Sequence, residues 1–224
     1  MKAFVVDLDS RENQSILKPS TRCSNNQVHQ INEAAKKIYE LIKKAKHSND
    51  DIILNHNEIK EAFFSPFKPQ LKNAQVFLSH SHADINKALE VKNYLENQIK
   101  RKVFIDSLFW DYKDDVLNKL AKYDDISRIE DAFTLILRES LQDMIEKCPY
   151  FVFLQSSNSV SFNQNLLKIT YSAWIYEELK IAHSISESRP IPMMESMQVF
   201  HDISPFLKSF ETITLKKLSQ QINS

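Results

Sequence analysis

The chain of 224 residues contains no glycine, although average usage of about 7% would give roughly 16. Glycine-rich phosphate loops, both the P-loop and the Rossmann fingerprint, are therefore excluded, because they need backbone without a Cβ close to the phosphate. Turns with positive φ are predicted to use asparagine and aspartate, as in Asn25-Asn26 and residues 49–51. A nucleotide ligand would have to be bound by side chains.

Cysteine, long apolar runs and a net charge are also scarce or lacking. The two cysteines, Cys23 and Cys148, have neither C-x-x-C spacing nor the density of a disulfide scaffold, which is typical of a reducing compartment. The N-terminal apolar run is too short for a signal peptide, and no apolar stretch of about 18 residues follows. The 29 basic residues balance the 29 acidic ones, so no global field attracts nucleic acid or an acidic membrane. The sequence predicts a soluble cytoplasmic protein.

The first 70 residues differ in pattern from the rest of the chain. Apolar residues recur at helical spacing over about 27–47, which predicts one amphipathic helix with a lysine-rich outer face. The two prolines of the stretch 65–69 disfavour helix, and we place a domain boundary there. Residues 1–70 are expected to form a mainly helical N-terminal extension, which has a regulatory or partner-binding role or packs on the core.

From residue 74 onward, short apolar runs alternate with longer helical periods, the pattern of a parallel sheet with crossover helices. The predicted strands are 75–79, 102–106, 150–155 and 190–194. Helices are predicted at about 83–100, 128–147 and 172–185. The second helix has capping-box spacing between Ser127 and Glu130. The expected fold class is α/β.

The stretch VFLSHSHADI sets two histidines and an aspartate directly after the first of these strands. The spacing of His80, His82 and Asp84 is that of metallo-β-lactamase-like hydrolases, whose histidine and aspartate ligands bind zinc. The fourth ligand of that motif would be histidine, but the chain has Ile85 there. A metal-dependent hydrolase is one alternative. The other is a strand that ends in a polar turn, with Asp84 as the cap of the next helix and no metal.

Five motifs, taken in order, resemble the TIR (Toll/interleukin-1 receptor) domain family, especially its free-standing bacterial members. VFLSHSHAD is similar to that family's first strand and turn, KVFIDSLFWD to its second strand and BB loop, and YFVFLQSSNS to its third strand. SAWIYEELKIA carries the family's S-x-W-x-x-x-E-L helix pattern, and RPIPMM resembles the next strand. The resemblance implies a flavodoxin-like TIR domain at 74–218, with a central parallel sheet flanked by helices. The interval 107–127 departs from the family because it is long for a BB loop and contains an extra helical turn near 114–122.

The resemblance also implies chemistry at one glutamate. Many TIR domains cleave NAD+ between nicotinamide and ribose with the glutamate of the helix pattern, which here is Glu178, one turn after Trp174. Cleavage of this bond builds positive charge on the ribose, so one carboxylate held against the sugar stabilises the transition state. On a helical wheel Glu178 lies beside the buried face, whereas Glu177 points into solvent. The buried face is predicted to contain Tyr171, Ile175, Leu179 and Ala182.

Further side chains are predicted to contact the dinucleotide through hydroxyl, imidazole, carboxylate or aromatic groups. They are Ser79, His80, Asp106, Phe109, Trp110 and Trp174. For Phe109 and Trp110, simple loop packing is an equally open alternative. No cofactor is expected, because NAD+ is the substrate. No metal site is expected either.

The function implied by the resemblance is that of an NAD+ glycohydrolase or ADP-ribosyl cyclase in antiphage defence. The expected partners are NAD+, further copies of the chain through TIR–TIR contacts, and a defence protein bound through residues 1–70, with no nucleic acid and no membrane. A non-catalytic TIR scaffold is the alternative from another functional class, and no residue of the sequence excludes it.

Overall fold

The computed structural model describes residues 1–17, 27–45, 55–64, 73–100, 102–105, 107–122, 127–162, 166–187 and 201–223. The chain forms two compact units, each made of separated segments. The first, which we call the sheet unit, comprises Met1–Thr21, Asn73–Ser107 and Gln142–Ser224. The second, which we call the helical unit, comprises Arg22–Lys72 and Leu108–Leu141. The helical unit is therefore inserted at two places into the sequence of the sheet unit.

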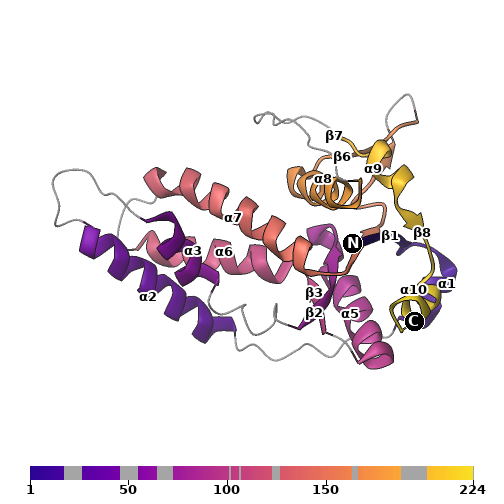
Figure 1. Cartoon of the computed structure of the whole chain (residues 1–224), viewed down its shortest axis with the longest axis horizontal. Helices are drawn as coiled ribbons and strands as arrows, with labels where there is room; N and C mark the ends of the chain where they lie inside the picture. The colour runs from indigo at the N-terminus through magenta and orange to yellow at the C-terminus, as the bar shows by residue number, and fades with distance from the viewer. Residues whose placement is uncertain are drawn as a thin grey trace. The chain divides into compact units, whose positions relative to one another are not determined.

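A five-stranded parallel sheet, in the order β3-β2-β4-β1-β8, forms the centre of the sheet unit (Figure 1). Its strands are β1 (Lys2–Asp7), β2 (Ala74–Ser79), β3 (Lys102–Ile105), β4 (Tyr150–Gln155) and β8 (Glu211–Thr212). β2 and β4 are buried over most of their length, as expected for a parallel sheet with helices on both faces. The predicted α/β fold class is confirmed, and three of the four predicted strands are present. The fourth, at 190–194, lies outside the described residues.

The N-terminal strand β1 occupies the fourth position of the sheet, between β4 and β8. Its sequence KAFVVD is short, β-branched in the middle and buried at its centre, which is typical of a strand inside a parallel sheet. The N-terminal helical extension is therefore not confirmed, because residues 2–7 belong to the sheet. The order β3-β2-β4 matches the first three positions of the flavodoxin-like order 2-1-3-4-5, and β1 stands in the fourth.

Two helices flank the sheet after β2 and β4. α5 (Ile85–Ile99), preceded by the single 3₁₀ turn η1 (His82–Asp84), connects β2 to β3, and α8 (Ala173–Glu187) follows β4. The two connections leave in opposite directions across the sheet, and because such crossovers are right-handed, α5 and α8 cover opposite faces. The helices predicted at 83–100 and 172–185 are confirmed.

α5 ends without the glycine that usually ends helices. Lys100 takes the left-handed conformation there, with φ 50°, and its N–H donates to the carbonyl of Glu96 over 2.9 Å. A residue with a Cβ pays roughly 1–2 kcal/mol for this conformation. The prediction that asparagine and aspartate take positive φ is wrong for the described residues, where Lys100 and Leu166 do so. The predicted turns at 25–26 and 49–51 lie outside them.

Three phenylalanines form a row across the sheet and into its core. Phe77 on β2 pairs in register with Phe104 on β3 and Phe151 on β4, and both ring pairs stack with centroids 5.7 Å apart. Full burial of such a side chain stabilises the fold by about 1.5–3 kcal/mol. Cys148 lies in the same core, where burial raises the pKa of its thiol to about 12. This cysteine is therefore a core residue and not a reactive thiol.

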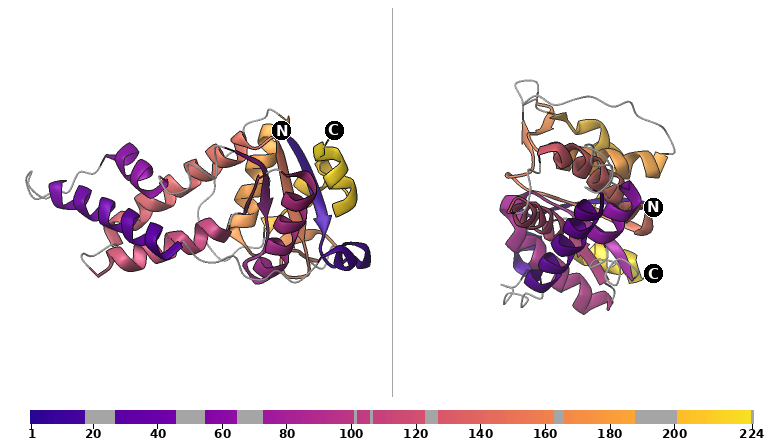
Figure 2. Two further views of the ribbon diagram at one scale, coloured as in Figure 1. Left: turned by 90° about the horizontal axis from the view of Figure 1, so that it is seen from below. Right: turned by 90° about the vertical axis from the view of Figure 1, so that its left-hand side faces the viewer.

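The two ends of the chain lie side by side in the sheet unit (Figure 2). α1 (Arg11–Ile16) follows β1, and α10 (Leu215–Asn223) follows β8. The buried side chain of Asn13 joins them, because its amide donates to the carbonyl of Asp7 over 2.7 Å and its oxygen accepts the N–H of Leu215 over 3.0 Å. The segment that follows the N-terminal strand is thereby connected to the C-terminal helix.

A small antiparallel sheet, in the order β5-β6-β7, lies beyond β4. It comprises β5 (Ser161–Phe162), β6 (Lys168–Thr170) and β7 (His201–Asp202), and α9 (Ser204–Ser209) follows it. Four large apolar side chains on and beside β5 and β6 are exposed: Phe162 by 64%, Leu166 by 80%, Leu167 by 37% and Tyr171 by 74%. We call these four residues the hairpin patch. Several exposed large apolar side chains along one hairpin are typical of a contact surface.

The helical unit contains α2 (Gln27–Ala45), α3 (His56–Phe64), most of α6 (Ser107–Leu120) and most of α7 (Ser127–Lys147). Its core includes Phe63 and Phe133, whose rings meet edge to face with centroids 5.6 Å apart. The helices predicted at about 27–47 and 128–147 are confirmed as α2 and α7, although Ser127 is the first helical residue and not its cap. α6 is much longer than the predicted extra turn at 114–122, because no residue between 107 and 120 breaks a helix.

Candidate active site

The carboxyl ends of β2 and β4 meet where the order of the sheet reverses. The strands are neighbours, yet the chain leaves β2 toward β3 at one edge and leaves β4 toward β8 at the other. In open α/β sheets such a switch point is where ligands bind. Buried polar residues follow both strands here, namely Ser79 and His80 at β2 and Ser156 at β4. This edge of the sheet is therefore the candidate site.

Glu178 lies on α8 and its carboxylate reaches the end of β2. Both Glu178 and Ser79 have an exposed fraction of 0%, and the Ser79 hydroxyl donates a hydrogen bond to Oε2 of Glu178. Burial of a carboxylate is unfavourable unless hydrogen bonds offset the lost hydration. The structure thus brings two of the predicted site residues into contact and buries Glu178 more deeply than the helical wheel predicts.

The buried face of α8 follows the helical period only where the helix has begun. Ile175, Leu179 and Ala182 are buried as predicted, with 3%, 0% and 0% of their surface exposed. The prediction for Tyr171 is wrong, because this residue precedes the helix. The helix begins after Ser172, whose hydroxyl accepts the N–H of Ile175. Trp174 is partly exposed at the first turn. Trp174 and Glu178 are thus one turn apart on a helix that Ser172 caps.

The neighbouring Glu177 does not point into solvent, so that prediction is wrong. Its side chain is 23% exposed, and Oε1 lies 3.5 Å from Nζ of Lys180, a lysine that is itself 6% exposed. The ammonium of Lys180 lies 5.7 Å from the ring centre of Tyr176. Burial, followed by the charge of Glu177, raises the pKa of the Tyr176 phenol. The two adjacent glutamates therefore have different partners, a serine for Glu178 and a lysine for Glu177.

The three residues with metal-ligand spacing separate in space. His80 is buried with 3% exposed, His82 is exposed, and Asp84 is buried with its carboxylate against the turn after β4. Among the residues that the structure describes, no three histidine, cysteine, aspartate or glutamate side chains are grouped as a metal site requires. His82 and Asp84 lie in the 3₁₀ turn η1, which joins the end of β2 to α5.

Asp84 stands at the N-cap position of α5, as predicted, but its side chain makes no capping hydrogen bond. The Ser156 hydroxyl donates to Oδ2, and the side-chain amide of Asn158 donates to Oδ1 over 2.9 Å. Neither Ser156 nor Asn158 is among the predicted site residues. The polar run Ser-Ser-Asn-Ser directly after a buried strand is the sequence signal that points to them.

A second aspartate binds the same turn from the opposite side. Asp9, two residues after β1, accepts the N–H of Ser157 at Oδ2 over 2.9 Å, and Nζ of Lys87 lies 3.2 Å from Oδ1. The N–H of Ser157 and the ammonium of Lys87 hold the pKa of the Asp9 carboxyl below its ordinary value. The turn after the central strand β4 is therefore bound by acids that follow both of its neighbours, β2 and β1.

Three other predicted site residues remain untested. Asp106 lies outside the described residues. Phe109 and Trp110 fall in α6, in a part where the backbone alone is described, and they belong to the helical unit. The described contacts therefore connect Ser79 with Glu178 and leave the predicted aromatic surface as a prediction.

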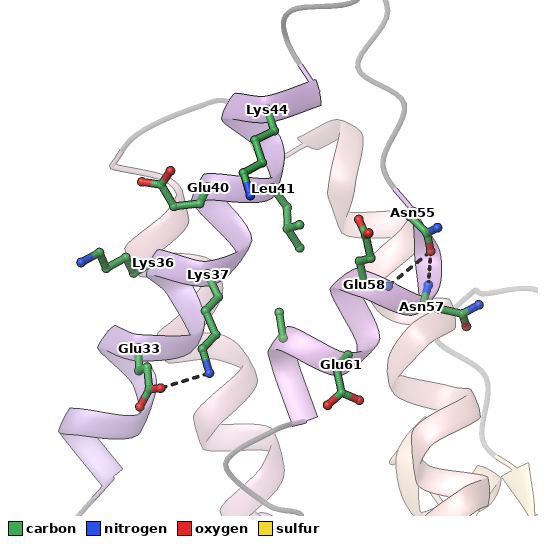
Figure 3. A pocket seen from close by; sticks show the side chains of 11 residues that line it. Glu33, Lys36, Lys37, Glu40, Leu41, Lys44, Asn55, Asn57, Glu58 and Glu61 are labelled. Atoms are coloured by element: carbon green, nitrogen blue, oxygen red, sulfur yellow. Dashed lines mark hydrogen bonds and ion pairs between the residues drawn. The ribbon is translucent and has the colours of Figure 1, made fainter.

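A large groove lies in the helical unit, between α2 and α3 (Figure 3). Its volume is about 920 Å³. Charged and polar residues dominate its lining, which consists of Glu33, Lys36, Lys37, Glu40, Leu41, Lys44, Asn55, Asn57, Glu58, Glu61 and Ala62. Figure 3 shows the Glu33–Lys37 ion pair and Asn55 accepting the N–H groups of Asn57 and Glu58, which are ordinary surface pairing and helix capping. None of the predicted site residues lines this groove.

Across the described parts of the chain, no helix has both the length and the apolar composition that crossing a bilayer requires. A scan against models of protein families finds no match, and searches of curated proteins and of solved structures find no significant match either. The resemblance to TIR domains therefore rests on the order and spacing of the motifs.

Proposed function

We propose that the chain is an NAD+ glycohydrolase of the TIR type, which cleaves the bond between nicotinamide and ribose with Glu178 as the catalytic residue. The observation that supports this proposal is the fully buried carboxylate of Glu178, hydrogen-bonded by Ser79 at the switch point of a parallel sheet. Strongly desolvated carboxylates at such positions are typical of functional sites.

The proposed reaction needs one carboxylate and no general acid. Nicotinamide in NAD+ is cationic and leaves as a neutral molecule with the electron pair of the broken C–N bond. The ribose is left with oxocarbenium character, which a carboxylate in a site of low dielectric stabilises more than it stabilises the ground state. Water then adds to the ribose and releases a proton, giving ADP-ribose, or a nucleophilic atom of the adenine adds instead and gives a cyclic product.

We propose a role for Ser79 that differs from the predicted one. Its buried hydroxyl is engaged with Glu178, so we propose that it orients the carboxylate and does not bind the substrate. His80 follows it in the same turn and is the proposed polar contact for the dinucleotide, with Trp174 as a further proposed contact.

Access to Glu178 requires a change from the described state, because its exposed fraction is 0%. We propose that assembly of several copies provides this change. The hairpin patch supports the idea, since it ends at Tyr171, directly before the helix that carries Glu178, and its apolar side chains are open to a partner. The proposed biological setting is antiphage defence in the cytoplasm. The proposed contact with a defence protein narrows from residues 1–70 to α2 and α3, because β1 lies in the sheet.

The test is incubation of the purified chain with NAD+ at several protein concentrations, followed by quantitation of nicotinamide and chromatographic identification of the other product. Glu178→Gln keeps the shape of the side chain and is expected to lower nicotinamide release by about 10²-fold or more. Glu40→Gln, an exposed glutamate of the groove, is the matched control. Undiminished release by Glu178→Gln would remove Glu178 from the catalytic role.

A non-catalytic scaffold is the second candidate, and the complete burial of Glu178 together with the exposed hairpin patch favours it. A scaffold is expected to assemble as protein concentration rises without releasing nicotinamide. Analytical ultracentrifugation combined with the same NAD+ assay separates the candidates, because only the enzyme releases nicotinamide in the assembled state.

A further inference from the structure

Asp84 is a buried acid that the proposed reaction leaves without a role. It is 2% exposed and stands at the first turn of α5, where an aspartate normally accepts N–H groups of the helix. Its carboxylate turns away from the helix and makes no capping bond. A buried carboxylate that does not cap its helix must be offset by other donors.

Both oxygens of Asp84 are bound by the turn 156–159 after β4. The donors are the hydroxyl of Ser156 and the amide of Asn158. The turn is also closed on itself, because Ser156 Oγ accepts the N–H of Asn158 over 3.0 Å and Ser159 Oγ accepts the N–H of Ser156 over 2.8 Å. A carboxylate accepts from both donors at once, whereas an amide accepts at one oxygen only and would need the Ser156 hydroxyl to change from donor to acceptor.

Asp84 and Ser79 stand at the two ends of the same connection, between β2 and α5. Ser79 holds Glu178, and Asp84 holds the turn after β4. β2 and β4 are hydrogen-bonded neighbours whose register includes Ser79↔Phe153. The connection that carries Ser79 and His80 is therefore anchored at both ends to elements on which the candidate site is built.

We propose that Asp84 is a positioning residue, whose hydrogen bonds to the turn 156–159 keep the ends of β2 and β4 together and so keep Ser79 aligned on Glu178. The inference rests on the proposed function of Glu178. A misplacement of about 1 Å can cost an enzyme about 10² in rate. Asp9 binds the same turn, but its side chain is 41% exposed, so water competes for it and its hold is weaker.

The first test compares Asp84→Asn with Asp9→Asn in the NAD+ assay. The new amide at position 84 accepts at one oxygen only, so the Ser156 hydroxyl loses its acceptor and must reorient, and kcat is expected to fall by about 10- to 100-fold with KM changed less than about 3-fold. Asp9→Asn is expected to cause a clearly smaller loss. The exchange Asp84→Asn/Asn158→Asp restores one amide–carboxylate hydrogen bond with the groups reversed, and it is expected to recover part of kcat. Asn158→Ala, at an exposed position, tests the same contact if Asp84→Asn does not fold.

The second test is hydrogen exchange of the backbone amides, which does not depend on activity. Exchange in residues 156–160 is expected to be faster in Asp84→Asn than in wild type, with a smaller change in Asp9→Asn. Unchanged exchange, or an active wild type whose kcat survives Asp84→Asn and Asn158→Ala, overturns the positioning role. If exchange is faster in Asp84→Asn while the wild-type chain releases no nicotinamide, the structural contact is supported and the proposed function is rejected.

Discussion

The carboxyl edge of the sheet and the groove between α2 and α3 both gather acidic side chains, but they solvate them in opposite ways. At the sheet edge Glu178 is 0% and Asp84 2% exposed, and each carboxylate accepts a serine hydroxyl. In the groove Glu33 and Lys37 pair across one helical turn with side chains that are 59% and 47% exposed. Water solvates the acidic side chains of the groove, whereas hydrogen bonds from the protein replace that hydration at the sheet edge.

This difference shows that the volume of a groove is a poor guide to function here. The groove has a volume of about 920 Å³, yet its charges are arranged like those of any solvated helix face and lower the free energy of the fold very little. Burial of two carboxyl groups at one edge of a sheet does not by itself favour folding. Their presence at the switch point is the reason to place the site there.

The prediction with the largest expected effect concerns whether the sheet unit and the helical unit unfold separately. Phe77→Ala in the sheet unit and Phe63→Ala in the helical unit each remove a fully buried ring, and each is expected to lower the free energy of unfolding by about 3–5 kcal/mol. The two tryptophans report on one unit each, Trp174 on the sheet unit and Trp110 on the helical unit.

Urea unfolding followed by fluorescence, with either Trp110 or Trp174 replaced by phenylalanine, is the measurement. If the units unfold separately, each cavity moves the midpoint of its own tryptophan more than that of the other. Equal shifts of both midpoints in both variants would show one cooperative transition and would break the distinction between the units.

The sequence predicts the elements whose pattern is local. α2, α5, α7 and α8 follow from helical spacing of apolar residues, and β2, β3 and β4 follow from short apolar runs between polar ones. Glu178, by contrast, is predicted from the resemblance of SAWIYEELKIA to the TIR helix pattern, and not from helical spacing alone. The helical period also predicts the buried positions Ile175, Leu179 and Ala182 of α8.

What the sequence does not predict depends on contacts between distant segments. β1 has six residues, as many as β2 and β4, but its place in the sheet is set by pairing with β4 and β8 far along the chain. The contact between Ser79 and Glu178 joins residues 99 positions apart, and that between Asp84 and Ser156 joins residues 72 apart. A helix-cap pattern predicts the position of Asp84 but not that its carboxylate turns to another strand.

The second prediction concerns Ser79, whose hydroxyl donates to the buried carboxylate of Glu178. Ser79→Ala removes the hydroxyl donor of a buried carboxylate and is expected to lower the free energy of unfolding by about 1–3 kcal/mol. Ser186→Ala is the control, because the Ser186 hydroxyl is exposed and donates only to the carbonyl of its own helix at His183. Chemical denaturation at pH 7 measures both, and equal losses would mean that Ser79 does not stabilise the carboxylate of Glu178.

The third prediction reverses the sign. Glu178→Gln replaces the buried carboxyl group by a neutral amide that still accepts from Ser79, and because functional acids are commonly kept at a cost to stability, the free energy of unfolding is expected to rise by about 1 kcal/mol while activity falls. Glu40→Gln in the groove is expected to change it by less than about 0.5 kcal/mol, because the side chain is exposed. Thermal and urea unfolding measure both variants. A loss of stability in Glu178→Gln would mean that the carboxylate stabilises the fold and is not retained at its expense.

The smallest effect sharpens the comparison within the sheet edge itself, where Asp9 resembles the groove more than it resembles Asp84. Hydrogen bonding by the N–H of Ser157 and the nearby ammonium of Lys87 lower its pKa in the folded chain below the ordinary value of 3.8. The unfolded state therefore binds the proton more tightly, so the stabilisation by Asp9 is complete well above pH 3.8 and is lost as the pH falls through 3.8 toward the lower folded value.

Asp9→Asn keeps an acceptor for Ser157 and removes the charge. The free energy of unfolding of wild type is expected to exceed that of the variant by at most about 1 kcal/mol at pH 6, because an exposed pair is screened by water. Urea unfolding at pH 6 and pH 3 measures the difference, which is expected to shrink at pH 3 and at high salt, as it does for surface charges. Because protonation of other carboxyls affects both proteins alike, the shrinking difference reports on Asp9. A difference that is constant with pH and salt would show that the contact acts through its neutral hydrogen bond, and Asp9 would then hold the turn as Asp84 does.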